Sequence, residues 1–337
     1  MERKVIRLHP VGLLEYSGFE PRGGCLPVIK GHQYEVRRDM TVSGDAPKDF
    51  VRIYEHGHGR KANSHTWPMY IAKVGHKHYP MESVTEHLLN RFGEVLGMRM
   101  AASRLVRVGG QVRFMSRYFL SDPHNQELVH GANIYSGYLN NDHGMVEAIE
   151  QEGLSRDFFT VQFTHDALRF MFPVQADDIF HAFLRMLVFD AYVGNNDRHF
   201  YNWGVIRNIS DKECPRFSPI YDTARGLFWN DHEDKLQDRL AHPKQVPAFV
   251  KKYCEGSGPK IGCDGKKVLN HFELIAEIKR IMPETLLAEM RTLVSPEGLK
   301  NLLNLFDLEF RGLLGPNRAY LVKECLAYRA ERLANLL

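Results

Sequence analysis

The sequence predicts an α+β protein built from two lobes. Residues 1–120 are expected to form a β-rich N-terminal lobe, and residues 121–337 a mainly helical C-terminal lobe. From about residue 50, short runs alternate apolar and polar residues as strands do, around a single run with helical spacing. From about residue 271 to the end, apolar residues recur at helical spacing almost throughout. Strands and helices in separate blocks are typical of the α+β class.

Composition and charge are those of an ordinary globular protein. Of the 337 residues, 44% are hydrophobic and 25% are charged, which is enough for a large core. The 44 basic and 41 acidic residues give a net charge of only +3, and they form no basic cluster. We therefore expect no direct contact with nucleic acid.

Several features favour a soluble protein of the cytoplasm. The first ten residues, MERKVIRLHP, contain no apolar signal-peptide core, and no window approaches the roughly 18 apolar residues of a membrane helix. The five cysteines lack CxxC spacing, which argues against a zinc site or a disulfide framework: Cys25, Cys214, Cys254, Cys263 and Cys325. We expect no membrane partner.

The N-terminal elements place a lysine on the apolar face of a strand. Residues 1–50 are short apolar runs broken by Gly and Pro, which indicate a small, turn-rich β subdomain. In residues 69–74, alternation puts Lys73 on the same face as Met69 and Ile71. A lysine there can reach into a nucleotide cleft and neutralise phosphate charge. The alternative is an edge-strand lysine that keeps the sheet soluble.

A helix predicted over residues 82–97 supplies a partner for this lysine. Its apolar stripe has helical spacing, and Gly97 stands at a C-cap position; the stripe comprises Val84, Leu88, Phe92 and Val95. Glu86 borders the stripe, so it can point inward and form an ion pair with Lys73. Glu82, one turn earlier, shares this face, and a solvated glutamate is the alternative for either residue.

A buried helix is expected to deliver a polar loop rigidly. Strands are predicted over residues 101–108 and 111–119, and a polar turn follows them. The helix predicted over residues 176–193 has acidic residues at its start, as the helix dipole favours, and is apolar nearly all round from residue 183. The loop GNNDRHFYNWG begins directly after it, at Gly194.

This loop and a later segment carry three residues with a recognisable spacing. Four residues separate Asp197 from Asn202, and Asp222 in PIYDTARG follows twenty residues after Asn202. The Asp-to-Asn spacing is that of the protein-kinase catalytic loop, where the Asp meets the substrate hydroxyl and the Asn holds magnesium. The order Asp-Arg-His, in place of His-Arg-Asp, indicates an atypical kinase loop. A solvated loop carboxylate at Asp197 would not account for the whole ordered set.

The stretches VFDAYVGNNDRHFYNWGVI and FSPIYDTARG resemble the HipA-like serine/threonine kinases. This family is distantly related to the phosphoinositide 3/4-kinases, which share the DRHxxN arrangement. The resemblance, over residues 60–230, implies a bilobal protein-kinase-like fold and the use of ATP and Mg²⁺. It further implies that Asp197 is catalytic, that Asn202 and Asp222 bind the metal, and that His199 packs near the phosphates.

Two regions of the N-terminal lobe are expected to contact the nucleotide. By resemblance, adenine would bind backbone groups near Ser116 and Tyr118. The loop of residues 56–65 contains Gly57 and Gly59, which permit close backbone approach to phosphate. By resemblance, Ser64 in this loop would be a regulatory site whose self-phosphorylation displaces the loop. The alternative is a flexible polar loop without function.

The resemblance also suggests biological partners. Many members of the family are toxins that phosphorylate translation factors such as aminoacyl-tRNA synthetases, and a helix-turn-helix antitoxin is an expected partner. One alternative is a phosphoinositide-type lipid kinase, although the metal Asp stands in YDT and no basic membrane patch is present. Another is a catalytically silent toxin subunit that acts as a binding partner in a repressor complex. The intact Lys73, Asp197, Asn202 and Asp222 argue against silence.

Overall fold

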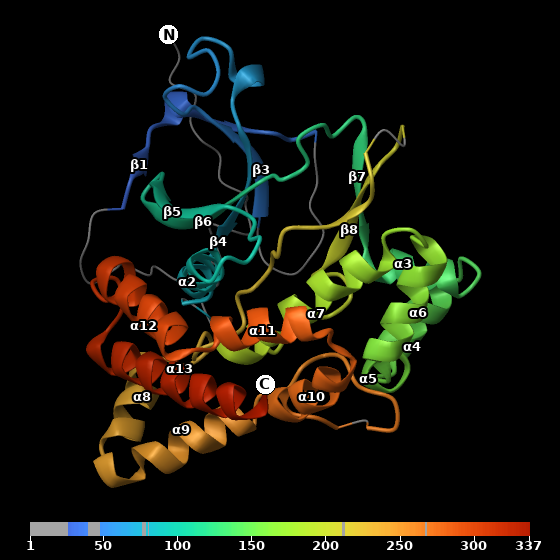
Figure 1. The fold of residues 1–337 in the computed structure, drawn as a ribbon. Coiled ribbons are helices and arrows are strands. Elements are labelled where there is room, and N and C mark those ends of the chain that lie inside the picture. The colour runs from blue at the N-terminus through green and yellow to red at the C-terminus, as the bar shows by residue number, and fades with distance from the viewer. Residues whose placement is uncertain (1–25, 40–47, 76–78, 80, 211–212, 267) are drawn as a thin grey trace.

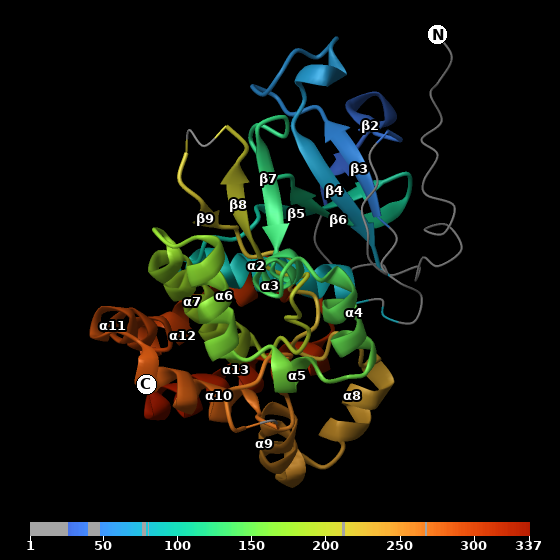
Figure 2. The same ribbon diagram turned by 90° about the vertical axis from the view of Figure 1, so that its right-hand side faces the viewer.

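The protein consists of a sheet-rich part and a larger helical part (Figure 1). The computed structural model describes residues 26–39, 48–75, 79, 81–210, 213–266 and 268–337. Much of the predicted turn-rich region of residues 1–50 lies outside these residues. The side view shows the strands toward one end and helices α8 to α10 toward the other (Figure 2). The α+β class predicted from the sequence is confirmed.

The N-terminal part contains a six-stranded sheet in the order β1-β5-β6-β4-β3-β2. All neighbouring strands are antiparallel except the pair β1 and β5. The strands are β1 (Val28–Ile29), β2 (Tyr34–Val36), β3 (Lys48–Ile53), β4 (Met69–Val74), β5 (Ser103–Val108) and β6 (Gln111–Arg117). The predicted strands at 69–74, 101–108 and 111–119 are therefore present. Strand β4 lies in the middle of the sheet, so Lys73 is not an edge-strand lysine.

The alternation of β4 separates two environments. Tyr70 and Ala72 belong to a small buried core on one side of the sheet, with residues of β2, β3, β5 and β6 around them. Lys73 lies on the opposite face, next to helix α2 (Glu82–Val95), which contacts β5 and β6. Because successive side chains of a strand point to opposite faces of the sheet, Lys73 is directed toward the helix.

Helix α2 follows the predicted stripe with one exception. Val84, Leu88 and Phe92 are buried, and Gly97 has a φ of +74° just beyond the helix end, as a C-cap glycine should. Val95 was expected in the stripe but is exposed, because it lies in the last turn of the helix.

The C-terminal part is organised around helix α7 (Ala176–Val193), which is largely buried from Phe183 to its end. Gly194, with a φ of +70°, ends the helix in the left-handed conformation that glycine adopts without steric cost. Its N–H donates to the carbonyl of Asp190. The predicted buried helix and the start of the polar loop after it are confirmed.

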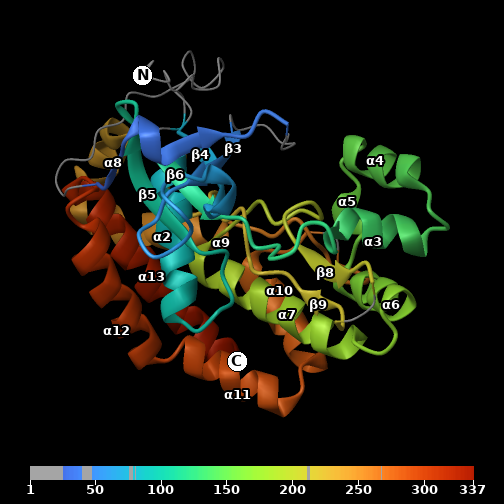
Figure 3. The ribbon, with the colours of Figure 1, turned by 90° about the horizontal axis from the view of Figure 1, so that it is seen from above.

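The remaining elements surround α7. A three-stranded sheet is formed by β7 (Gln126–His130), β8 (Gly204–Asn208) and β9 (Arg216–Phe217). The other helices are α3 (Gly131–Tyr138), α4 (His143–Gln151), α5 (Ser155–Phe158), α6 (Val161–Met171), α8 (Glu233–Leu240), α9 (Val246–Glu255), α10 (His271–Ile278), α11 (Glu284–Leu293), α12 (Pro296–Leu305) and α13 (Pro316–Leu336). From above, the α3–α6 group and the α12–α13 pair lie on opposite sides of α7 (Figure 3). Among the described residues, no helix has the length and hydropathy needed to cross a membrane.

Candidate active site

A lysine bound by two carboxylates marks the junction of the two parts of the molecule. The ammonium of Lys73 lies 2.8 Å from Glu86 Oε1 and 2.8 Å from Asp222 Oδ1. Strand β4 supplies Lys73, helix α2 supplies Glu86, and the segment after β9 supplies Asp222, 149 positions along the chain from the lysine. The ion pair of Lys73 with Glu86 is the one that the strand and helix patterns predicted, and Asp222 completes it.

The charges of this cluster are strongly coupled. Burial alone would lower the pKa of Lys73, but the carboxylates of Asp222 and Glu86 outweigh it and raise the pKa. Removal of the Asp222 carboxylate from water would raise its pKa. The charge of Lys73, helped by those of Lys48 and Arg198, outweighs this effect and holds the pKa well below the usual range. Burial raises the pKa of Glu86 to about 7, against the lowering effect of Lys73. Asp222 is therefore the firmer anionic partner of the lysine.

The loop after α7 is held in shape from inside. The amide nitrogen of Asn202 donates to the Asp197 carbonyl at 2.8 Å, which closes the loop across the four intervening residues. The buried guanidinium of Arg198 pairs with Asp190 at the end of α7, with Nε 2.8 Å from Oδ2. The same guanidinium donates from Nη1 to the carbonyls of Asn202 and Tyr221, both at 2.6 Å. One nitrogen thus joins the loop to the residue preceding Asp222.

Arg198 is a functional candidate that the sequence patterns did not identify. It is the central residue of the DRH triplet. Its partners are two backbone carbonyls and one buried carboxylate, and the spacing of residues in the sequence does not reveal such contacts. Lys48 was missed as well: it lies opposite Lys73 in the pairing of β3 with β4, and its charge acts on Asp222.

The backbone at Asp222 adopts an uncommon conformation. Its φ is +55°, in the left-handed region where Asp is one of the more tolerated residues. Both flanks are tied to the N-terminal part: the Ala101 N–H donates to the Ile220 carbonyl at 2.9 Å, and the Thr223 hydroxyl donates to the Asn90 side chain at 3.0 Å. Such backbone strain persists where the surroundings over-determine it, which is common at functional sites.

The oxygen atoms of Asn202 and Asp222 suit a magnesium ion. Because the Asn202 nitrogen is engaged with the Asp197 carbonyl, its amide oxygen is the atom left for a metal. The Asp222 side chain remains 35% exposed although one oxygen contacts Lys73. An amide oxygen and a carboxylate are the hard donors that Mg²⁺ prefers, with nucleotide phosphates and water supplying the rest.

Asp197 lies beside two further charged residues. Its Oδ2 is 3.1 Å from Nη1 of Arg225, and the Arg225 Nε is 3.9 Å from Glu82 Oε1. Burial raises the pKa of Glu82, against the lowering effects of Arg225 and Lys73. Glu82, the alternative to Glu86 in the sequence pattern, therefore also points toward the site but pairs with arginine.

The loop with Gly57, Gly59 and Ser64 is not brought to this cluster. It connects β3 to β4 at the end of the hairpin where Met69 begins β4, whereas Lys73 is near the other end. Four strand residues correspond to about 13 Å. The loop therefore joins β4 at the end away from Lys73, and its contact with nucleotide phosphates stays a prediction.

Three other predicted residues have defined surroundings but untested roles. The Tyr118 N–H donates to the Met69 carbonyl at 2.9 Å, so that group is already engaged. Ser116 pairs with both Ile71 and Ser103 in the middle of the sheet. His199 is half-buried in the loop. Burial lowers its pKa and so favours the neutral ring, although the charge of Asp197 acts in the opposite direction.

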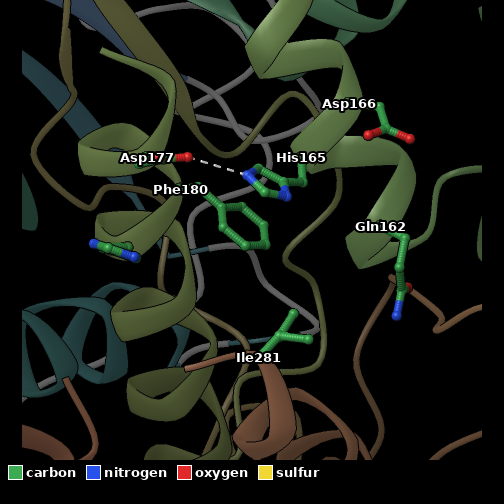
Figure 4. A pocket seen from close by; sticks show the side chains of 7 residues that line it. Gln162, His165, Asp166, Asp177, Phe180 and Ile281 are labelled. Carbon is green, nitrogen blue, oxygen red and sulfur yellow. Dashed lines mark hydrogen bonds and ion pairs between the residues drawn. The ribbon is translucent and has the colours of Figure 1, made fainter. Parts of the chain in front are cut away.

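A separate cavity of about 480 Å³ lies between α6, the start of α7 and Ile281 (Figure 4). Within it, the His165 ring stacks on Phe180 at 4.1 Å and its Nε2 lies 3.4 Å from Asp177. Asp166 is directed away from this pair (Figure 4). Fourteen helical residues from Phe180 to Gly194 correspond to about 21 Å. The cavity is therefore remote from Lys73 and Asp197, and we assign it no part in the site.

The likeness to solved structures supports the bilobal fold. The crystal structure of the Helicobacter pylori proinflammatory kinase CtkA superposes with a TM-score of 0.70 at 16% identity, over 92% of this chain and 96% of that one. The HipA protein of Shewanella oneidensis, in a complex with HipB and operator DNA, has a TM-score of 0.49 at 16% identity, over 88% of this chain and 64% of that one. The predicted bilobal, kinase-like fold is confirmed by the match to CtkA.

Sequence comparison identifies the family. A stretch of 69 residues is 33% identical to the protein Y4dM of Sinorhizobium fredii, which amounts to 20% of this chain and 16% of that protein. Residues 40–279 match the family described as the HipA-like C-terminal domain. This match covers more than half of the chain and includes Lys73, Glu86, Asp197, Asn202 and Asp222. The protein therefore belongs to the HipA-like C-terminal domain family.

Proposed function

We propose that the protein is an ATP- and Mg²⁺-dependent kinase that phosphorylates serine or threonine in a protein substrate. The observation that carries this proposal is the ammonium of Lys73, held 2.8 Å from both Glu86 and Asp222. A lysine fixed by a helix glutamate and by a metal-binding aspartate is the arrangement that positions nucleotide phosphates in kinases. Family membership and the fold support the same activity.

Each residue of the site has a defined task in this reaction. Lys73, oriented by Glu86, would donate to the α- and β-phosphates. Asn202 and Asp222 would hold Mg²⁺, which neutralises charge on the phosphates when it is bound. Asp197 would accept the proton of the substrate hydroxyl and orient that hydroxyl for attack. Arg198 donates to the carbonyls of Asn202 and Tyr221. It thereby keeps Asn202 close to the segment that carries Asp222.

The activity is tested by transfer of radiolabelled γ-phosphate from ATP. The assay uses the purified protein alone or mixed with cell extract. We expect the label on protein, and acid hydrolysis should release it as phosphoserine or phosphothreonine. Phosphoinositide vesicles serve as the competing acceptor. Label on lipid alone would favour the lipid-kinase alternative, and the absence of nucleotide binding would favour the catalytically silent one.

Replacing Lys73 by Met should weaken nucleotide binding while preserving the fold. Hydrogen bonds to charged groups typically contribute about 1.5–3 kcal/mol, so we expect the affinity for ATP to fall by about tenfold to a hundredfold. Calorimetry measures the affinity, and circular dichroism checks the fold. Lys300→Met, at an exposed surface pair with Glu297, is the control. Unchanged affinity and turnover in Lys73→Met would assign the lysine a purely structural role.

Ser64 is proposed to affect the nucleotide less than the sequence pattern suggested. Its loop joins β4 at Met69, about 13 Å of strand from Lys73, and charges separated by that length in solvent are largely screened, because the Debye length is about 8 Å at physiological ionic strength. We expect Ser64→Asp to change ATP affinity by less than about twofold. Mass spectrometry of the wild type and of Asp197→Ala shows whether self-phosphorylation occurs there. A large loss of affinity in Ser64→Asp would restore the regulatory role.

Family membership supports a proposal for the cellular role. We propose a toxin-type kinase whose substrate is a translation factor and whose partner is a helix-turn-helix antitoxin. Phosphoproteomics of cells that express the wild type or Asp197→Ala identifies the substrate, because its phosphorylation must depend on Asp197. Equal phosphoproteomes in the two strains would contradict this proposal.

A further inference from the structure

Arg225 contacts the carboxylate that the proposed function makes the proton acceptor. Its Nη1 lies 3.1 Å from Asp197 Oδ2, and its Nε lies 3.9 Å from Glu82 Oε1. The guanidinium carbon lies 5.1 Å from the centre of the Trp229 ring, which packs against its face. The guanidinium is thus bounded by two carboxylates and one aromatic ring, and its side chain is 36% exposed.

A backbone hydrogen bond next to Asp197 holds Arg225 in this contact. The N–H of Asn196, the residue before Asp197, donates to the carbonyl of Arg225 at 3.1 Å. Gly226 packs so closely that an added Cβ would stand 2.8 Å from the Val193 carbonyl. The segment that carries Arg225 therefore lies directly on the catalytic loop. Since Arg225 follows Asp222 by three residues, one short segment supplies both a metal ligand and a cation to the same site.

The chemistry of a guanidinium limits what Arg225 can do there. A guanidinium has N–H donors and no acceptor, so Arg225 cannot serve as the base or relay the substrate proton. It has five N–H donors in a planar fork that matches phosphate oxygens. The contacts with Asp197 and Glu82 engage its Nη1 and Nε sides, which leaves donors for a third anionic group.

The position of Asp197 locates that third group. A base must lie about 2.6–3.2 Å from the hydroxyl whose proton it accepts. If Oδ1 of Asp197 accepts the proton, the guanidinium of Arg225 lies 3.1 Å from the second oxygen, Oδ2, of the same carboxylate. It is then next to the hydroxyl and to the phosphoryl group that the hydroxyl attacks. Negative charge on the phosphoryl oxygens must be stabilised during transfer, and an arginine is an effective stabiliser.

We propose that Arg225 is a further catalytic residue, whose guanidinium donates hydrogen bonds to the phosphoryl group in transit to the hydroxyl that Asp197 orients. This proposal rests on the proposed function. In the step, the substrate oxygen forms a bond to the γ-phosphorus as the bond to the β-phosphate oxygen breaks. The electron pair leaves with ADP, and the hydroxyl proton passes to the Asp197 carboxylate. Arg225 keeps all its protons throughout.

The test compares a ground-state ligand with a transition-state analogue. The full chain is prepared as wild type, Arg225→Ala and Arg225→Lys, with Arg185→Ala as the matched control. Arg185 is 34% exposed and pairs with Glu289 on the surface, so it resembles Arg225 in exposure and in having a carboxylate partner. Calorimetry measures the affinities for Mg²⁺·ADP alone and for Mg²⁺·ADP with aluminium fluoride. Transfer of γ-phosphate is measured in parallel, and melting temperatures check folding.

We expect Arg225→Ala to bind Mg²⁺·ADP within about threefold of the wild type, because the arginine faces only the transferring group. Transfer should fall by about a thousandfold, the lower end of the effect of an arginine at this position in phosphoryl transfer. The gain in affinity on adding aluminium fluoride should be lost in the same variant. Arg225→Lys should recover only part of both, since lysine keeps the charge but loses the planar fork. Arg185→Ala should match the wild type.

Three results with the variants would overturn this role. Faster transfer in Arg225→Ala would show that the arginine caps Asp197 and inhibits the enzyme. Transfer and analogue binding at wild-type levels in that variant would show that the contact is incidental. Equal losses of ADP and analogue binding in both variants, with lowered melting temperatures, would show a structural role. If the wild type itself neither binds Mg²⁺·ADP nor transfers phosphate, the proposed function fails and the role of Arg225 fails with it.

Discussion

Replacing Asp197 by Ala should reduce γ-phosphate transfer by at least about a hundredfold while leaving the affinity for ATP nearly unchanged. In the proposed mechanism the carboxylate acts as a general base, which typically accelerates proton-coupled steps by about a hundredfold to ten-thousandfold. It would contribute little to ground-state binding, because Lys73 and the proposed metal ligands would hold the phosphates. Removing a carboxylate that pairs with Arg225 also leaves that arginine without its nearest anion, so we include Arg225→Ala and the double variant.

Replacing Asp222 by Ala should instead abolish both transfer and tight nucleotide binding. This substitution removes a proposed metal ligand and the firmer anionic partner of Lys73 at once. Radiolabelled ATP measures transfer, and calorimetry with and without Mg²⁺ measures binding. The wild type should gain affinity on adding Mg²⁺, whereas Asp222→Ala should not. Asp166→Ala, at the remote cavity, serves as a control. Near wild-type transfer in Asp197→Ala or Asp222→Ala would contradict the assignment of the site.

The pair of Lys73 and Glu86 was predictable because two local periodicities determine it. Alternation along residues 69–74 decides which face of the strand carries the lysine, and helical spacing decides which side of α2 carries the glutamate. Both patterns hold over a few residues and survive in the structure. The Asp197, Asn202 and Asp222 set was found by spacing and family resemblance, and their roles remain predictions.

The residues that were missed depend on contacts that no local pattern encodes. Arg198 binds backbone carbonyls of Asn202 and Tyr221, which any residue type supplies. Arg225 meets Asp197 only because the segment after β9 folds onto the loop after α7. The role of Gly57 and Gly59 stays a prediction, because glycine indicates where the backbone can turn or approach another group but does not indicate what the backbone approaches. The hairpin register decides that, and it places this loop away from Lys73.

Breaking the buried pair of Asp190 and Arg198 should destabilise the fold more than any surface change. Each side chain is only 2% exposed, and Asp190 accepts from Arg198 Nε and Nη2 and from the Asn195 amide, at 2.8, 3.0 and 2.9 Å. Asp190→Ala would leave the guanidinium buried without its counter-charge. We expect the free energy of unfolding to fall by about 3–5 kcal/mol, measured by urea denaturation. Glu289→Ala at the surface pair with Arg185 should cost less than about 1 kcal/mol.

A double variant separates the structural task of this pair from its positioning task. Replacing both residues by apolar ones, Asp190→Leu with Arg198→Met, removes both buried charges together and should recover much of the stability lost in Asp190→Ala. Transfer should stay low, because the carbonyls of Asn202 and Tyr221 lose the donor that holds the loop against the segment leading to Asp222. The affinity for Mg²⁺·ATP should fall together with the rate, since both proposed metal ligands, Asn202 and Asp222, would become mobile. A stable double variant with wild-type Mg²⁺ dependence and rate would show that Arg198 does no more than neutralise Asp190.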